Sequence, residues 1–259
     1  MVVLPDQRFP VEGGSLAYDL FRPAGDGPFP LVVFIHGGGW ISGDRTDYRD
    51  EALWLAPQGY ACACIDYRLA PLYPYPTPVA DCQRFFTFVA ANAGSLGIDS
   101  EDMTVFGNSA GGHLALMCGL SATVAGTSEP AVRPQSVVAV CAISDLRVPA
   151  ESNLPLSFTF LEQFMDGGYE DREEAWAAAS PVCHLEDARG RFLVVHGTED
   201  DVVPIAQSRS LVQRLSGQGS DVEFVELQGE GHSFSWEGWS TIRQEALNFL
   251  KADQKVGRH

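Results

Sequence analysis

Residues 103–122, MTVFGNSAGGHLALMCGLSA, decide the fold of this chain. The apolar run at 103–106 is typical of a buried strand, and the apolar spacing over 110–122 predicts a helix. Ser109 lies at the junction, between Gly107 and Gly111. A turn this tight requires neighbours without bulk and leaves the serine hydroxyl exposed above the edge of a sheet. A plain Gly/Ser-rich turn would have the same composition, so the rest of the chain must decide whether Ser109 is a nucleophile.

Strands and helices alternate on both sides of this stretch. Residues 31–35 are apolar throughout, as expected of a strand buried on both faces. The patterns predict further strands at 16–22, 60–66, 137–143, 192–196 and 222–227, and helices at 46–58, 79–92, 205–216 and 241–251. This order predicts a single α/β domain over 1–259, with a mainly parallel central sheet and helices on both faces.

Residues 146–185 interrupt the alternation. They are rich in aromatic side chains, and within them only 171–179 has a helical pattern. Long segments of this kind inside a compact domain are usually functional or contain their own helices. We expect a small cap over the site, the alternative being a peripheral excursion that packs its aromatic side chains on the core.

Charge and cysteine content exclude several classes of function. With 17 basic and 34 acidic residues the net charge is −17, which disfavours nucleic acid and anionic membranes as partners. The acidity favours solubility and, more weakly, neutral over anionic substrates. The six cysteines include no C-x-x-C pair or Cys/His cluster, so we expect no disulfide scaffold, no metal and no cofactor. The first ten residues contain no basic-then-apolar signal region, so we expect a cytoplasmic protein. Whether the protein forms a homodimer is left open.

A serine hydroxyl needs a base to accept its proton and an acid to orient that base. His232 is the candidate base, because it follows the last strand in a glycine-containing loop, whereas His36 and His196 end strands and His113 lies in the helix after Ser109. The acid should follow a strand between Ser109 and His232. Asp200 is the first choice, and its neighbours Glu199 and Asp201, as well as the more distant Asp145, stay open.

Hydrolysis of an acyl group also needs backbone N–H donors that stabilise the developing oxyanion. Residues 36–39, His-Gly-Gly-Gly, follow a buried strand and can expose their amides without obstruction from side chains. The amide of Ala110, next to Ser109, would complete this oxyanion hole. A phosphate-binding loop is the rival reading, but the Lys-Ser/Thr pair of a P-loop and the G-x-G-x-x-G spacing are both missing.

Five segments together resemble the α/β-hydrolase superfamily, and within it the hormone-sensitive-lipase-like and bacterial feruloyl-esterase-like esterases. They are HGGGW at 36–40, DYRLAP at 66–71, GNSAGGH at 107–113, HGTED at 196–200 and GHSF at 231–234. The resemblance implies that Ser109 is the nucleophile, Asp200 the acid and His232 the base. It also implies Gly38, Gly39 and Ala110 as the oxyanion hole, with residues 66–68 supporting that loop.

These assignments predict a serine carboxylesterase that acts on small-molecule esters through an acyl-enzyme. Trp40 and Trp236 are expected to line a pocket for acyl chains of about two to four carbons, because clash soon outweighs the ~0.8 kcal/mol gained per buried CH₂. The chain lacks a long N-terminal helical cap, which argues against long acyl groups. HGGGW also resembles the corresponding loop of arylformamidases, so a formyl amide stays open as the substrate, as do a feruloyl ester and an acetylated sugar. A non-catalytic binding protein is disfavoured, since Ser109, Asp200 and His232 are all present.

Overall fold

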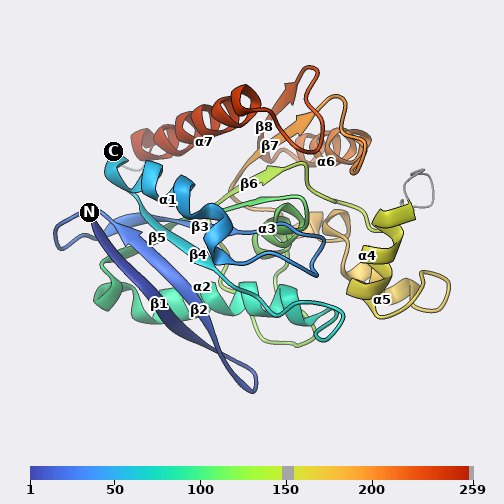
Figure 1. Cartoon of the computed structure of the whole chain (residues 1–259), viewed down its shortest axis with the longest axis horizontal. Helices are drawn as coiled ribbons and strands as arrows, with labels where there is room; N and C mark the ends of the chain where they lie inside the picture. Colours follow the sequence, from blue (N-terminus) through green and yellow to red (C-terminus); the bar gives the residue numbers. More distant parts are fainter. Residues whose placement is uncertain (148–154, 257–259) are drawn as a thin grey trace.

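The computed structural model describes residues 1–147 and 155–256 (Figure 1). Their centre is an eight-stranded sheet in the order β1-β2-β4-β3-β5-β6-β7-β8. All pairs from β4 to β8 are parallel, whereas β1–β2 and β2–β4 are antiparallel. The predicted mainly parallel α/β sheet is therefore confirmed. Its strands are β1 (Val2–Val11), β2 (Gly14–Arg22), β3 (Phe29–Ile35), β4 (Ala61–Ile65), β5 (Ile98–Asn108), β6 (Ser136–Val140), β7 (Arg191–Gly197) and β8 (Asp221–Leu227).

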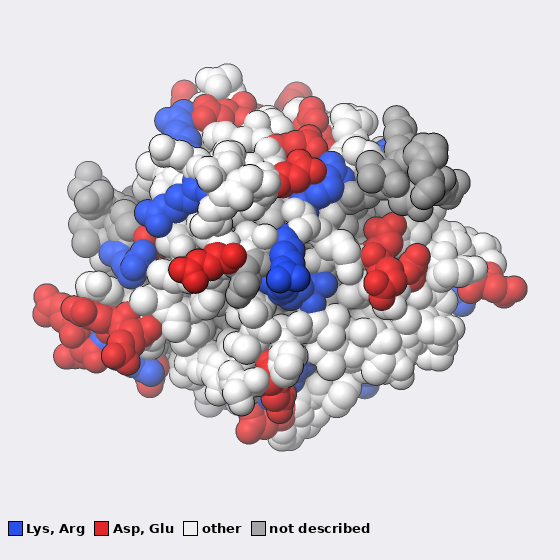
Figure 2. Space-filling model, turned by 180° about the vertical axis from the view of Figure 1, so that it is seen from behind, with Lys and Arg blue, Asp and Glu red and all other residues white. Residues whose placement is uncertain are grey.

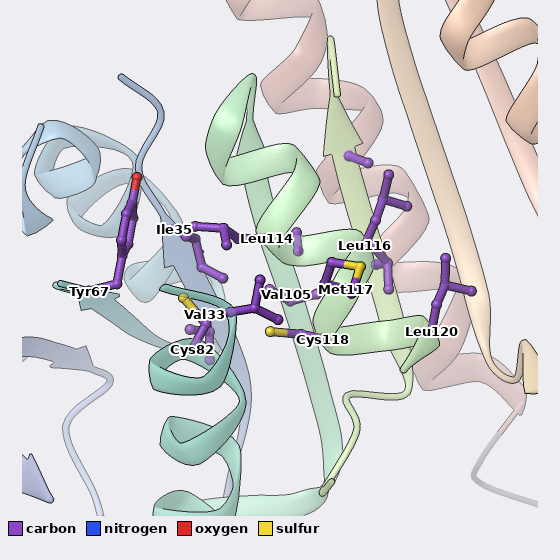
Figure 3. Packing of buried hydrophobic residues seen from close by; sticks show 14 of the residues in the cluster. Val33, Ile35, Tyr67, Cys82, Val105, Leu114, Leu116, Met117, Cys118 and Leu120 are labelled. Atoms are coloured by element: carbon purple, nitrogen blue, oxygen red, sulfur yellow. The ribbon is translucent and has the colours of Figure 1, made fainter. Parts of the chain in front are cut away.

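Helices cover both faces of the sheet, and the strand residues alternate between them. Val33 and Ile35 pack on one side with α2 (Thr77–Leu96), α3 (Ala110–Leu120) and α6 (Ala206–Gly217), as Figure 3 shows in part for α2 and α3. Val32 and Phe34 pack on the other side with α1 (Arg49–Leu55) and α7 (Trp236–Val256). Apolar residues at every position of β3 are thus used on both faces, which is why this strand reads as an uninterrupted apolar run.

Outside the segment predicted as a cap, three elements differ clearly from the sequence-based expectation. β1 was not predicted, because it is an edge strand, where Pro5 and Pro10 are tolerated and the alternation of polar and apolar residues is weak. The helix expected at 46–58 is divided into η1 (Arg45–Tyr48), α1 and η2 (Ala56–Gln58), with a left-handed Gly59 at its end. α7 begins at Trp236, earlier than the predicted residue 241.

The segment predicted as a cap contains α4 (Pro155–Met165), α5 (Glu173–Ala178), η4 (Pro181–Cys183) and η5 (Leu185–Asp187). In its described part it contains no strand, as expected, and α5 matches the helical pattern at 171–179. α4 was not predicted. Residues 148–154 of the expected cap lie outside the described residues.

Acidic side chains lie in separate groups on the face of the molecule seen in Figure 2. On the face seen in Figure 2, basic side chains lie between acidic ones and form no continuous basic surface. Within residues 1–147 and 155–256, no helix combines the length and apolar character needed to cross a membrane.

Candidate active site

Ser109 lies on a strained turn between β5 and α3. Its backbone has φ +53° and ψ −121°, and its amide donates to the Val140 carbonyl at 2.9 Å. A Cβ at Gly107 would lie 2.2 Å from the Gly111 carbonyl oxygen, and a Cβ at Gly111 would lie 2.1 Å from the Ile35 carbonyl oxygen. Both glycines are therefore required by close backbone contacts, and the turn aims the serine hydroxyl away from the sheet.

The structure brings Ser109, His232 and Asp200 together from three separate loops. The Ser109 hydroxyl donates to Nε2 of His232 at 3.0 Å, and Nδ1–H of His232 donates to Oδ2 of Asp200 at 2.8 Å. These two bonds place the proton of the neutral imidazole on Nδ1, which leaves Nε2 free to accept from the serine.

Asp200 is held as a buried carboxylate by more partners than His232 alone. Its side chain is fully buried, and Oδ1 accepts from the amides of Val202 and Val203 at 2.9 and 2.8 Å. Nε2 of His196 lies 3.2 Å from Oδ2. Burial raises the pKa of Asp200, but hydrogen bonds from His196 and His232 outweigh it and hold the pKa well below its usual value. The group is therefore a permanent anion next to the imidazole.

The other acidic candidates do not reach His232. Asp201 and Glu199 are exposed. Both oxygens of Asp145 accept from Arg147, at 2.8 Å each. Among the carboxylates left open by the sequence, Asp200 alone contacts the imidazole.

His196 was not predicted as part of this site, although its position at the end of β7 was noted. It is fully buried, donates from Nε2 to the Val203 carbonyl at 2.8 Å and accepts from the Ser208 hydroxyl at Nδ1, at 2.7 Å. It thus braces the loop that carries Asp200.

The glycine loop after β3 lies beside Ser109. Gly38 and Gly39 have φ of +97° and +61°, and a Cβ on Gly38 would lie 2.3 Å from the Ser42 carbonyl oxygen. Among the described residues, neither amide donates a hydrogen bond. Gly39, Ser109 and Ala110 line one cavity, so these backbone groups face a common space.

Of residues 66–68, for which the resemblance implied a supporting role, Tyr67 contacts this loop directly, and Arg68 instead bonds to Asp81. The Tyr67 hydroxyl lies 3.2 Å from the carbonyl oxygens of both His36 and Gly37, and the two rings of Tyr67 and His36 stack at 4.3 Å. Asp66 accepts from the backbone and the guanidinium of Arg45, each at 2.8 Å.

Trp40 and His113 connect the glycine loop to α4 and to the residue that follows α5, in the segment predicted as a cap. The Trp40 indole N–H donates to Nδ1 of His113 at 3.1 Å, and Nε2–H of His113 donates to the Ala179 carbonyl at 2.8 Å. Trp40 also stacks on Phe164 of α4, with ring centroids 4.4 Å apart. Burial lowers the pKa of His113 to about 4, so the imidazole is neutral and can accept from Trp40.

A cavity of about 410 Å³ adjoins Ser109, within the range of small-molecule sites. Trp40 lines it, as expected. Trp236 does not: its side chain is 75% exposed and belongs to a separate surface hollow with Trp54 and Arg243. The wall is instead formed by Phe160 and Leu161 of α4. In the sequence, the aromatic content of residues 146–185 indicated a residue such as Phe160, and no signal indicated Leu161.

One group of possible metal ligands was found among the described residues, and it is part of this site. Cys141, Asp200 and His232 offer ligand atoms within 4.8 Å of one another. However, Asp200 and His232 already bond to each other, and burial raises the pKa of the Cys141 thiol. The arrangement suits proton transfer better than metal binding.

Sheet order, serine turn and hydrogen-bonded Ser–His–Asp chain define the protein as an α/β-hydrolase. The chain belongs to the BD-FAE family, which matches residues 18–215.

Several esterases are similar to this chain. LipC of Mycobacterium tuberculosis, described as an esterase, is 35% identical over 223 residues, which are 80% of this chain and 53% of LipC. Esterase LipQ of the same organism is 31% identical over 217 residues, covering 79% of this chain and 50% of LipQ. The chain therefore spans about half the length of these curated relatives. The thermophilic esterase Est2 of Thermogutta terrifontis, in its butyrate-bound structure, shares the fold with a TM-score of 0.81 at 22% identity, over 99% of this chain and 94% of Est2.

Proposed function

We propose that the protein is a serine carboxylesterase that hydrolyses small acyl esters. The observation that carries this proposal is the continuous hydrogen-bonded chain from Ser109 through His232 to the buried anion of Asp200. It opens on a cavity large enough for a small ester. Membership of the BD-FAE family and similarity to the esterases LipC and LipQ support the same reaction class.

In this proposal Ser109 Oγ attacks the ester carbonyl carbon while Nε2 of His232 accepts the hydroxyl proton. Asp200 stabilises the imidazolium that forms and does not itself take the proton. When the tetrahedral intermediate collapses, the C–O bond to the alcohol breaks and His232 returns its proton to the leaving oxygen. Water then attacks the acyl-enzyme, with His232 again as the base, and releases the acid and free Ser109.

The negative oxygen of each intermediate needs donors that are already in place. We assign this role to the amides of Gly38, Gly39 and Ala110. The backbone of the first two is fixed in left-handed conformations, and the space beside Gly38 is closed by the Ser42 carbonyl. Donors held in this way need no rearrangement when charge develops.

A preference for acyl chains of two to four carbons is part of the proposal. The bulky Phe160, Leu161 and Trp40 line the cavity and limit the space beside the reacting carbonyl. Est2, with which the chain shares its fold, has been determined with butyrate and with propionate bound. An acyl-length series of p-nitrophenyl esters tests this preference, and a maximum at eight carbons or longer would contradict it.

The test of the mechanism is Ser109→Ala. Its kcat with p-nitrophenyl acetate should fall by roughly 10³-fold or more, with the remaining rate coming from binding and the oxyanion donors. Circular dichroism should show an unchanged fold. Near-full activity in this variant would exclude Ser109 as the nucleophile.

Covalent labelling separates an esterase from a binding protein that has kept the fold. Structures of Est2 are described as phosphorylated by paraoxon and phosphonylated by sarin. A fluorophosphonate probe should therefore add one label to this protein, on Ser109, and none to Ser109→Ala. An unlabelled wild-type protein would contradict the proposal.

A further inference from the structure

The cavity beside Ser109 has two kinds of wall. Apolar side chains form one, with Ile143, Phe160, Leu161, Val202 and Val203 among them. The other is polar and comes from α6, which contributes Gln207, Ser210 and Arg214. These three residues are spaced by three and four, so they share one face of the helix. An ester bound at Ser109 therefore meets a polar strip as well as an apolar surface.

Gln207 is bound to the protein through both the oxygen and the nitrogen of its side-chain amide. Its side-chain oxygen accepts from the amides of Ser144 and Asp145 at 3.0 and 2.8 Å, and its Nε2 donates to the Asp145 carbonyl at 3.0 Å. Gln207 thus fixes the loop after β6. By contrast, neither the Ser210 hydroxyl nor the Arg214 guanidinium has a hydrogen-bond partner among the described residues. The charged donor that remains for a ligand is therefore Arg214, with the Ser210 hydroxyl on the same face of the helix.

The local charge of this wall is opposite to that of the whole protein. Asp145 also lines the cavity, but both of its oxygens are bound by Arg147, at 2.8 Å each. Among the described residues that line the cavity, the Arg214 guanidinium is therefore the charged group that has no bonded partner, in a protein of net charge −17. A planar guanidinium with free N–H groups matches the geometry of a carboxylate.

We propose that Arg214, with Ser210, binds a carboxylate carried by the ester substrate, so that the enzyme prefers half-esters of dicarboxylic acids or esters of hydroxy acids to uncharged esters. This inference rests on the proposed esterase function. It reverses the expectation of a preference for neutral substrates, because the charge next to the bound ester matters more than distant charges screened by solvent.

Matched substrates test this preference. The mono-ethyl esters of succinate, glutarate and adipate are compared with ethyl butanoate, pentanoate and hexanoate, each pair having the same number of acyl carbons. A second set compares 4-acetoxybutanoate with butyl acetate and places the carboxylate on the alcohol. Hydrolysis is followed in a pH-stat at about 0.15 M salt. The measured quantity is the ratio of kcat/KM for the anionic ester to kcat/KM for its neutral partner.

The ratio should fall about tenfold in Arg214→Gln in at least one set, further in Arg214→Glu, and less in Arg214→Lys, which keeps the charge without the planar fork. Arg209→Gln is the matched control, because Arg209 lies on the same helix but pairs with Glu226 at 2.8 Å and does not line the cavity. If the ratio falls in the acyl set, the acyl half of the ester lies against α6. If it falls in the alcohol set, the alcohol half lies there.

The inference is overturned if the ratio in Arg214→Gln is unchanged in both sets, or if it falls equally in Arg209→Gln. The proposed function still holds in that case, provided that the neutral esters are hydrolysed. Hydrolysis of none of the esters by the wild type would overturn the proposed function instead. In that case calorimetric titration with the adipate half-ester still decides the inference: wild type should bind it about tenfold more tightly than Arg214→Gln, and equal binding overturns it.

Discussion

The glycine turns beside Ser109 and the helices that cover them are held in different ways. Gly38, Gly107 and Gly111 are surrounded by main chain, and a Cβ on any of them would lie within 2.3 Å of a backbone oxygen. Gly39, which faces the cap, is different, because its Cβ would meet the ring of Phe160 at 3.1 Å. Backbone contacts thus fix the glycine turns, whereas adjustable side-chain contacts join these turns to the helices that cover them.

This difference separates chemistry from substrate choice. The groups proposed to react lie at the carboxyl ends of β3, β5 and β7 and in the loop after β8, where the sheet fixes them. The groups that shape the cavity lie on α4 and α6, where a changed side chain alters the space without moving the sheet. Variants in the first region should therefore lower kcat for every substrate, and those in the second should change which substrate is preferred.

The largest effect is expected at Asp200. Asp200→Asn removes the anion that fixes the tautomer of His232 and stabilises its protonated form, and kcat with p-nitrophenyl acetate should fall on the order of 10⁴-fold. Asp201→Asn changes the adjacent but exposed carboxylate and should stay within about twofold of the wild type. Equal losses would contradict the assignment of Asp200 as the acid.

The glycine loop gives the next largest effect. Gly38→Ala places a methyl group against the Ser42 carbonyl at a φ of +97°, so the loop must move and its amide leaves the position proposed for the oxyanion hole. A loss of roughly 10²- to 10³-fold in kcat is expected for all esters. Gly39→Ala meets a ring that can yield and should cost about tenfold. Steady-state kinetics with acetate and butanoate esters measure both. A larger loss in Gly39→Ala than in Gly38→Ala would show that contacts with α4, not with the main chain, hold the loop.

His113 links the two regions and should make stability depend on pH. Its pKa is lowered by burial from 6.5 to about 4, so the unfolded chain binds this proton more readily than the folded protein. Stability from this group is complete above pH 6.5 and falls as the pH drops towards 4, by about 3 kcal/mol in all. His113→Gln should flatten the dependence of the unfolding free energy on pH in this window. Urea denaturation at pH 7, 5.5 and 4.5 measures it, and parallel curves for wild type and His113→Gln would refute it.

The same contrast explains what the sequence could predict. Glycines, the serine and the strand ends leave local signals, because only certain residues fit a turn such as 107–111 or a fully buried strand such as β3. Asp200 could be chosen first as the partner of His232, but its neighbours Glu199 and Asp201 stayed open, since one residue of register decides which carboxylate turns inward. Phe160 was missed as a site residue, because its contact with Gly39 joins segments far apart in the chain. His196 was missed although its partners Asp200, Val203 and Ser208 are near in sequence, because no pattern shows that the loop folds back onto the ring. Trp236 was expected in the pocket from its distance to His232, but it begins α7 and faces solvent.

The smallest effect is expected from Phe160→Ala. The ring lines the cavity and touches the space beside Gly39, so its removal enlarges the cavity without disturbing Ser109. We expect the best acyl chain to become about two carbons longer, with kcat for the acetate ester changed less than about threefold, because each extra buried CH₂ gains only ~0.8 kcal/mol. Tyr169→Ala is the control, since Tyr169 lies in the same segment but is 40% exposed and packs on Trp176. If the acyl profile of Phe160→Ala matched that of the wild type, or if Tyr169→Ala shifted it equally, α4 would not set the acyl length.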